Sequence, residues 1–423
     1  MKTYAASVGL LAISTSFLSA VENNVLNSQQ SSKPWSVSAS LRGFYDDNIN
    51  SAPSSIAQES WGFQISPSIN YGFAGEQTSL NLGYYLAANW YDSPYVNWSS
   101  PWQITQTFEG ALSHTFSPRV NVTLQDSFVI GQEPDILQVA NTPFATSQTI
   151  NGDNKRNYAS IDLNLQATTL LGFQVGYGNI IYNYEDSGPG SNSALLDRMQ
   201  HAVHIDSRWT IQPQTIGILG YMYSQTDFTA DQFLAPPTIF NPTPPKSDDR
   251  NSRGNTIYVG VEHTFTPDIS GALKGGVQIV DYPNDSSADT QVSPYVQGSL
   301  RYAYRTTSSV EAGVSLMRSP TDAYNPTVGG SYVLDAQSLV FYAAWVHEIL
   351  PHLFSNLNGS FQQQQFNGGS LNNDNGYYYR VGASLGYEFT KHLSANVGYN
   401  WDQADNYDPY NRNRVYIGVS ATY

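Results

Sequence analysis

Apolar and polar residues alternate one by one along most of this chain, most regularly at the C-terminus. The last ten residues, 414–423, alternate without a break and stop on an aromatic ring. Since successive side chains of a strand point to opposite faces, this segment is a strand with one apolar face. Such a terminal strand is typical of outer-membrane β-barrels, where it closes the sheet and acts as an assembly signal. The apolar face consists of Val415, Ile417, Val419, Ala421 and Tyr423.

The same alternation recurs upstream and predicts eighteen strands in all. The number is even, as it is in single-chain bacterial barrels. Most segments slightly exceed the ~9–11 residues that a tilted strand needs to cross a bilayer. We therefore predict an all-β fold, a transmembrane antiparallel up-and-down β-barrel of about 18 strands. The strands are 35–45, 61–73, 78–91, 102–116, 120–130, 157–167, 171–184, 200–210, 215–224, 255–265, 269–282, 291–304, 309–318, 337–348, 353–366, 377–389, 393–402 and 414–423.

The connections between these strands alternate between short and long. Short connections include 74–77, 117–119, 266–268, 305–308 and 390–392. Long connections include 131–156, 185–199, 225–254, 319–336 and 403–413. Short periplasmic turns and long external loops are expected of such barrels, so both termini are predicted to be periplasmic.

The two longest loops, 131–156 and 225–254, have two interpretations. In the first interpretation the loop folds inward and narrows the barrel lumen. In the second it stays outside the barrel as a mobile exterior loop. For 225–254 the exterior interpretation is favoured because its prolines prevent strand pairing. These prolines are Pro236, Pro237, Pro242, Pro244 and Pro245.

The N-terminus has the pattern of a secretion signal. Lys2 precedes a mostly apolar stretch, and 18–20 (Leu-Ser-Ala) suits signal-peptidase cleavage. The alternative, a first buried helix, lacks a capping or amphipathic pattern. We expect a signal peptide at 1–20, a short periplasmic segment at 21–34 and the barrel at 35–423. The sequence contains no cysteine, which excludes a lipid anchor, disulfides and thiol chemistry and suits an exported chain.

The amino-acid composition agrees with a transmembrane β-barrel. Charged residues make up 13% of the chain, against about 25% in a typical soluble domain. The mean hydropathy is −0.35, and no apolar run of about 18 residues follows the signal, which excludes membrane helices. The formal net charge of −15 argues against a nucleic-acid partner, because binding to phosphates requires clusters of Lys and Arg.

A weak repeat marks the ends of several strands before short turns, at 114–119, 263–268, 347–352 and 387–392. Each copy places an aromatic residue or His, then a bulky apolar residue, just before the turn. Amphipathic rings suit the headgroup level of a membrane, so we interpret the repeat as part of an aromatic girdle. The alternative, a metal site, requires ligands that converge on one point, whereas these histidines lie on different hairpins. No metal or other cofactor is predicted.

Position within each strand predicts which charged residues face the lumen. An Arg or Lys on the lipid face near the midplane would cost ~2–4 kcal/mol, so inward placement is favoured. Because both signs are interspersed, the simpler interpretation is that these charges pair across strands and solvate the wall. Alternatively, Lys274 and Arg301 form a positive patch that influences ion selectivity. The inward charged residues are Arg42, Glu109, Asp162, Asp206, Arg208, Glu262, Lys274, Arg301, Glu311, Arg380 and Glu388.

Both ends of the chain resemble the putative β-barrel porin type 2 family. The resemblance lies in segments 35–49 and 61–71 near the start and in 386–399 and 413–420 near the end. It implies an outer-membrane barrel, often of unassigned substrate, with some related barrels linked to polysaccharide export. It carries over no catalytic or binding residue.

The sequence predicts no enzyme. His201 and His204 face opposite sides of a strand and cannot share a ligand. No strand–turn–helix nucleophile elbow is present, and the glycines of 187–190 lack the following helix of a phosphate-binding loop.

Three functional classes remain open. A diffusion porin for small polar solutes leads, because eighteen strands leave a water-filled interior unless it is plugged. The second is a conduit for a polymer such as polysaccharide, with inward tyrosines stacking on sugar rings: Tyr258, Tyr295, Tyr378 and Tyr416. The third is a structural or adhesive surface barrel. The expected partners are outer-membrane lipid, the barrel-assembly machinery and the solute or polysaccharide; homo-oligomers are compatible with the sequence.

Overall fold

A computed structural model describes residues 34–94, 100–132, 138–139, 145–146, 152–323, 332–406 and 409–423. The predicted signal peptide 1–20 and nearly all of the segment 21–34 lie outside the described residues. So do most of the loop 131–156 and part of the loop 319–336.

Eighteen long strands pair into one antiparallel sheet, and all eighteen predicted segments are confirmed as strands. The first five are β1 (Trp35–Asp46), β2 (Ser60–Ala74), β3 (Thr78–Tyr91), β4 (Trp102–Ser117) and β5 (Val120–Gly131). Two short strands, β6 (Gln138–Val139) and β7 (Ala145–Thr146), pair only with each other. The remaining strands are β8 (Asn154–Gln166), β9 (Leu171–Tyr184), β10 (Arg198–Gln212), β11 (Thr215–Phe228), β12 (Ser252–Thr266), β13 (Ile269–Asp281), β14 (Gln291–Arg305), β15 (Ser308–Ser319), β16 (Asp335–Leu350), β17 (Leu353–Asn367), β18 (Asn375–Thr390), β19 (Leu393–Asp405) and β20 (Tyr410–Thr422).

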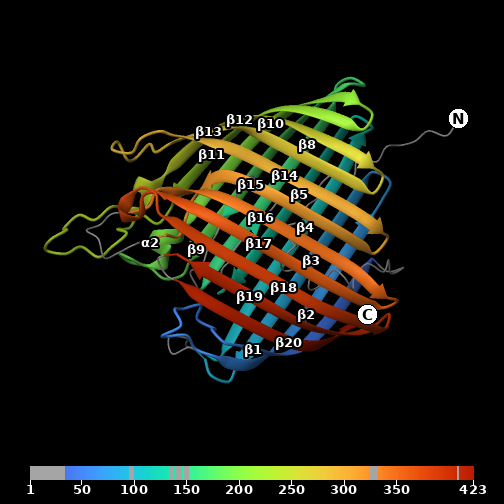
Figure 1. Cartoon of the computed structure of the whole chain (residues 1–423), viewed down its shortest axis with the longest axis horizontal. Helices are drawn as coiled ribbons and strands as arrows, with labels where there is room; N and C mark the ends of the chain where they lie inside the picture. The colour runs from blue at the N-terminus through green and yellow to red at the C-terminus, as the bar shows by residue number, and fades with distance from the viewer. Residues whose placement is uncertain are drawn as a thin grey trace.

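The sheet closes on itself through β1 and β20 (Figure 1). Leu41 pairs with Val419, and Gly43 pairs with Ile417. At the end of the seam, the Val37 N–H donates to the Tyr423 carbonyl at 3.1 Å, and the Tyr423 N–H donates to the Val37 carbonyl at 2.8 Å. Among the described residues, closure leaves the eighteen-stranded sheet with no edge strand whose backbone groups would face lipid unpaired.

Short turns and long loops lie at opposite ends of the barrel, as the sequence predicts. In Figure 1 the C-terminus lies among the short turns on the right, and the longest described loops extend to the left. The described parts of the long loops contain three short helices: α2 (Asn192–Leu196) and the 3₁₀ helices η2 (Ser247–Arg250) and η3 (Gly369–Leu371). Among the described residues, no helix is long and apolar enough to cross a membrane.

The outer face is apolar and has aromatic residues near both ends. Toward the loops, the Phe63 ring lies 5.3 Å from that of Trp90 and 5.5 Å from that of Trp102. Toward the turns, the rings of His114 and Phe116 lie 4.4 Å apart. Two aromatic bands that flank an apolar belt are characteristic of outer-membrane barrels. The exposed apolar belt includes Leu41, Ile69, Leu82, Leu124, Ile161, Ile205, Leu219, Val259, Leu273, Leu300, Leu357, Val381, Val397 and Ile417.

Two of the repeated histidines, His114 and His263, contact a threonine of the neighbouring strand. His114 Nδ1 lies 2.7 Å from the Thr78 hydroxyl, and His263 Nδ1 lies 2.8 Å from that of Thr215. The His263 ring also lies 4.5 Å from that of Phe265, which repeats the His114 arrangement. The repeat is therefore a local strand-end motif on separate hairpins, in agreement with the girdle interpretation.

Candidate functional site

The inner face of the barrel carries polar side chains that hydrogen-bond from strand to strand. The Ser38 and Ser68 hydroxyls lie 2.6 Å apart across β1 and β2. The Gln64 amide donates to Asn89 at 2.8 Å across β2 and β3. All eleven charged residues predicted to face inward alternate with outward residues and therefore lie on this face: Arg42, Glu109, Asp162, Asp206, Arg208, Glu262, Lys274, Arg301, Glu311, Arg380 and Glu388.

Lys274 is the centre of one charged network. Its ammonium lies 2.9 Å from the Asp206 carboxylate, whose side chain is 0% exposed. It also lies 5.0 Å from the centre of the Tyr258 ring, and the Tyr258 hydroxyl donates to Asp206. These three residues come from β13, β10 and β12. Strands β10 and β13 are not adjacent, since β11 and β12 lie between them. Their side chains meet because they point to the concave inner side of the curved sheet.

Gly220 on β11 makes this contact possible. A Cβ atom at Gly220 would lie 2.2 Å from the Tyr258 ring and 2.4 Å from the Asp206 carboxylate. The missing side chain lets the tyrosine ring and the carboxylate meet across the intervening strand. Sequence reasoning identified Asp206 and Lys274 as inward charges but not this pairing, because the partners lie far apart in the chain.

One further ion pair and one histidine–carboxylate contact lie on the same part of the wall. The Arg208 guanidinium forms two hydrogen bonds to Glu262, of 2.8 and 2.5 Å, across β11. His204 Nε2 lies 3.5 Å from an Asp162 oxygen. These contacts favour the interpretation that inward charges pair across strands. In particular, Lys274 is engaged by Asp206 and does not form a free positive patch with Arg301.

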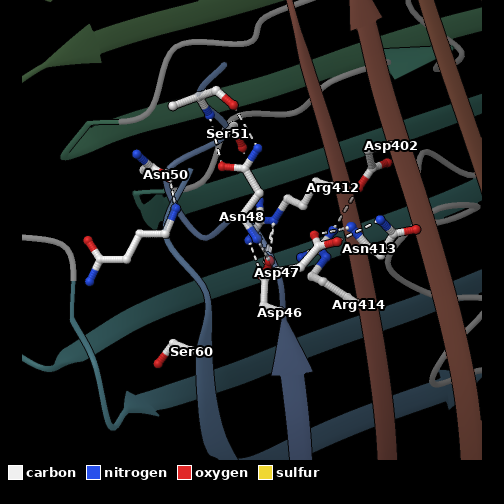
Figure 2. Close-up of polar contacts among 12 residues, drawn as sticks. Asp46, Asp47, Asn48, Asn50, Ser51, Ser60, Asp402, Arg412, Asn413 and Arg414 are labelled. Atoms are coloured by element: carbon white, nitrogen blue, oxygen red, sulfur yellow. Dashed lines mark hydrogen bonds and ion pairs between the residues drawn. The ribbon is translucent and has the colours of Figure 1, made fainter. Parts of the chain in front are cut away.

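The seam between β1 and β20 carries a second polar network near the loop end (Figure 2). Arg412 binds both Asp46 oxygens, with its shortest bond at 2.6 Å, and both side chains are buried. On the opposite face of the ladder, Asp47 accepts hydrogen bonds from the Asn413 backbone and side chain at 2.6 and 2.7 Å. The Asn48 amide donates to the Asn411 carbonyl at 2.9 Å. The two ends of the barrel sequence are thus joined by side chains as well as by the backbone ladder.

Next to the seam, one carboxylate is shared by two arginines. Asp402 on β19 lies 3.2 Å from Arg380 Nε on β18 and 3.2 Å from Arg414 Nη2 on β20. Sequence reasoning predicted Arg380 to be inward but missed Asp402, Arg412 and Arg414. Asp402 and Arg414 lie within the predicted strands 393–402 and 414–423, so the alternation rule applies to them directly, whereas Arg412 requires the last strand to begin earlier, as it does in β20.

The loop 225–254 is packed at its base and exposed at its tip. Leu234 is buried against Leu195 and Leu196 of α2, and the Arg250 guanidinium donates to the Leu195 carbonyl at 2.8 Å. The tip carries Phe240, which is 99% exposed. The exterior interpretation therefore describes the tip, while the base forms part of a structured cap at the loop end of the barrel.

Asp197 lies in this cap, between α2 and β10. It accepts a hydrogen bond from the Tyr184 backbone at 2.6 Å and one from the Ser193 hydroxyl at 2.5 Å. Burial raises the pKa of Asp197 despite these two donors, because the charged form is desolvated.

The loop 131–156 shows one sign of inward folding. The short strand β7 within it contacts β15. Six strands, β9 to β14, separate β8 from β15 around the wall, so the two lie on nearly opposite sides. This contact favours the constriction interpretation for that part of the loop.

Toward the loop end, the inner wall is lined by buried uncharged polar groups. Gln200, Thr256 and Gln364 are fully buried, and the Ser338 hydroxyl lies 3.3 Å from the amide nitrogen of Gln362. Among the described residues, neither polar atom of the Gln200 amide has a hydrogen-bond partner, nor has the Thr256 hydroxyl. The wall is therefore more enclosed here than toward the short turns, where inward residues such as Asn81 are exposed.

The four inward tyrosines proposed to stack on sugars are buried. The ring of Tyr258 lies 5.3 Å from that of Tyr295, and Arg42 lies over the ring of Tyr416 at 5.0 Å. Tyr378 packs with Ala404 and Tyr410. Because neighbouring side chains cover these rings, they offer little free aromatic surface to a passing chain.

The described residues contain no group of three or more His, Cys, Asp or Glu that could hold a metal ion. His204 and Asp162 lie 3.5 Å apart within the wall network.

Residues 238–423 match the family model described as putative beta-barrel porin 2. This match includes the closing segments 386–399 and 413–420 and confirms the resemblance there, while the opening segments 35–49 and 61–71 lie outside the matched residues. No curated protein matches the chain. The family match over part of the chain is in agreement with the closed sheet and its apolar outer face, which are the architecture of an outer-membrane β-barrel.

Solved barrels of similar architecture include OpdK from Pseudomonas aeruginosa, at 10% identity with a TM-score of 0.44, covering 92% of this chain and 99% of that one. OccAB4 from Acinetobacter baumannii is 10% identical with a TM-score of 0.43, covering 94% of this chain and 100% of that one. OccK2 (OpdF) from Pseudomonas aeruginosa, solved with glucuronate, is 11% identical with a TM-score of 0.45, covering 92% of this chain and 98% of that one.

Proposed function

We propose that this protein is an outer-membrane channel for the passage of small polar solutes. The observation that carries the proposal is the contrast between the two faces of a closed eighteen-stranded sheet. The outer face is apolar, while the inner face carries amides, hydroxyls and paired charges. A barrel of this strand number encloses a wide interior, and a polar lining supports a water-filled path.

The enclosed loop half of the wall supports a preference for small solutes. There the fully buried Gln200 and Thr256 retain unpartnered polar atoms among the described residues. Unpartnered groups of this kind are costly unless water or a solute satisfies them, so they suit hydrogen-bonding guests. The contact of β7 with β15 supports a narrowing at the same end.

This arrangement favours the solute channel over a polymer conduit. A conduit for polysaccharide would require a continuous wide path and free aromatic surfaces. The inward tyrosines are covered by neighbours such as Lys274 and Arg42. No described contact favours the adhesive barrel.

The proposed orientation places the short turns and both termini in the periplasm and the long loops outside. The alternation of short and long connections supports it. The expected partners are outer-membrane lipid around the apolar belt and the barrel-assembly machinery that recognises the terminal strand. We propose no catalytic activity.

Swelling of liposomes that contain the purified barrel tests this function. Neutral solutes of increasing size should enter at decreasing rates: a tetritol fastest, a hexose more slowly and a trisaccharide least. Gln200→Ala should raise the relative rate of the hexose if the amide lies at the narrowing. Absence of swelling with all three solutes would contradict the channel, and equal rates for all three would contradict the narrowing.

A further inference from the structure

The backbone ladder between β14 and β15 stops short of the loop end. Its last pair is Val296 with Leu316. Both strands continue beyond this pair, but each is paired only on its other side. The ladder of β14 with β13 runs on to the first residue of β14, and that of β15 with β16 runs on to the last residue of β15. The barrel wall therefore has a parting, formed by 291–295 of β14 and 317–319 of β15.

Pro294 explains why this ladder stops. Proline has no backbone N–H, so it removes one hydrogen bond from a ladder. Pro294 pairs with Val277 of β13 in an unbroken register. Alternate residues of an antiparallel strand direct their backbone groups to opposite neighbours, so the missing N–H of Pro294 lies on the β15 side. The parting is therefore encoded in the sequence of β14.

Side chains bridge the parting where the backbone does not. Gln278 of β13 reaches across β14: its Oε1 accepts a hydrogen bond from the Arg318 backbone N–H at 2.8 Å, and its Nε2 lies 3.5 Å from the Arg318 carbonyl. Closer to the loops, the Arg318 guanidinium donates to Gln291 at 3.2 Å and to Asp335 at 2.7 Å. Bonds of this kind can open locally while the strands stay paired on their other sides.

The parting separates two apolar surfaces. On the inner face, Tyr295 and Met317 border it and belong to a buried apolar cluster that also contains Val340. On the outer face, Val292 and Ile279 are exposed and lie in register on β14 and β13. An apolar surface inside the barrel matches an apolar group better than a hydrated polar one. The inner cluster and the outer face are therefore suited to the same kind of group.

We propose that the parting is a lateral opening through which small solutes with an apolar part pass between the lumen and the membrane. Opening breaks the side-chain bonds of Gln278 and Arg318 and leaves the flanking ladders intact. It joins the inner apolar cluster to the apolar outer face, so the apolar part of the solute need not cross polar surface. This inference rests on the proposed channel, since such a solute must first enter the lumen, and adds a second way out of it.

Thiol labelling from the lipid phase tests the opening, because the chain contains no cysteine. Met317→Cys and Met222→Cys each place one thiol in the inner apolar cluster, at positions that are both 3% exposed. Met317 borders the parting, whereas Met222 lies on β11 behind intact ladders with β10 and β12. Pyrenylmaleimide dissolved in the bilayer should label Met317→Cys faster than Met222→Cys. Each rate is divided by that of a water-soluble maleimide, which reaches the thiols from the lumen.

Two further substitutions in the Met317→Cys protein should move the labelling rate in opposite directions. Pro294→Val restores a backbone N–H on the β15 side and should lower the rate. Gln278→Ala removes a side-chain bridge and should raise it roughly 2- to 10-fold, the effect of one ordinary hydrogen bond on an opening equilibrium. Pro67→Val is the matched control and should leave the rate unchanged. Pro67 also interrupts a ladder, that of β2 with β3, but pairs resume on both sides of it.

Uptake by cells tests the class of solute. N-phenyl-1-naphthylamine is apolar and fluoresces once it is dissolved in lipid. Cells that express the wild-type barrel should take it up faster than cells that express Pro294→Val, while glucose entry should be the same in both. All variants should show the heat-dependent gel mobility of a folded barrel.

Equal labelling of Met317→Cys and Met222→Cys from the lipid phase would overturn the lateral opening, and so would a rate that Pro294→Val leaves unchanged. Equal uptake of the naphthylamine with wild type and Pro294→Val would overturn the assignment to apolar solutes. In each case ions and glucose would still pass and the channel function would stand. Failure of ions and glucose to pass through the wild-type barrel would instead contradict the channel itself.

Discussion

Asp206 shows how strongly single residues of the inner wall depend on partners from other strands. It is fully enclosed and is satisfied by the Lys274 ammonium and the Tyr258 hydroxyl. An enclosed carboxylate is stable only with such partners, because desolvation of an unpaired charge costs several kcal/mol. The contact exists because Gly220 leaves room between the strands.

The first prediction concerns Lys274. Lys274→Met should destabilise the folded barrel by about 3–5 kcal/mol, because it leaves a buried carboxylate unpaired. Unfolding by urea in lipid vesicles measures this change. Arg301→Met is a suitable control, because this arginine is exposed on the same face. The double variant Asp206→Asn/Lys274→Met should recover most of the loss; no recovery would show that Lys274 does not act through Asp206.

At the scale of elements, the strands could be predicted from the sequence because their signal is local. Alternation such as that of 414–423 sets both the strand and the face of each side chain. Successive side chains of a strand point to opposite faces of the sheet. The position of Arg42, Lys274 and Arg380 within their strands is therefore enough to predict that they face inward.

Contacts between distant strands could not be predicted in the same way. The pairing of Asp46 with Arg412 depends on the register in which β1 meets β20, and these strands lie at opposite ends of the chain. The base of the loop 225–254 is likewise ordered by α2, through contacts such as that of Arg250 with the Leu195 carbonyl. Local polarity and proline content carry no information about these partners.

The second prediction concerns the terminal strand. Replacing Ile417 and Val419 with Asp places two carboxylates on the exposed apolar face of β20 and should prevent stable insertion. Deleting 415–423 should have the same effect, because β1 would lose its partner. Ser420→Asp, on the inner face of the same strand, should insert normally. The measurement is the yield of heat-modifiable barrel in outer-membrane fractions, and a normal yield of the Ile417/Val419 variant would contradict the closure model.

At the scale of the whole molecule, the two ends of the barrel differ in character. The short-turn end carries exposed inward residues, whereas the loop end is covered by packed loop bases and buried amides. In the proposed channel a solute would therefore meet its narrowest region near the loop end, and in the proposed orientation the exposed loop tips would lie on the side of entry.

The third prediction concerns the orientation of the barrel. Chymotrypsin added to intact cells should cut after Phe240, at the exposed tip of the loop 225–254. The turn at 117–119, which contains no internal aromatic residue but follows Phe116, should stay protected until the outer membrane is permeabilised. Phe240→Ala should remove the first cut. Cleavage after Phe116 in intact cells, with Phe240 protected, would reverse the proposed topology.

The central claim is that the closed barrel encloses an aqueous path, and conductance across a planar lipid bilayer tests it most directly. Folded wild-type protein should produce discrete, uniform current steps in potassium chloride. The Ile417→Asp/Val419→Asp preparation should produce none, because it lacks a closed barrel. Absence of current steps from wild-type protein that shows the gel mobility of a folded barrel would contradict the claim.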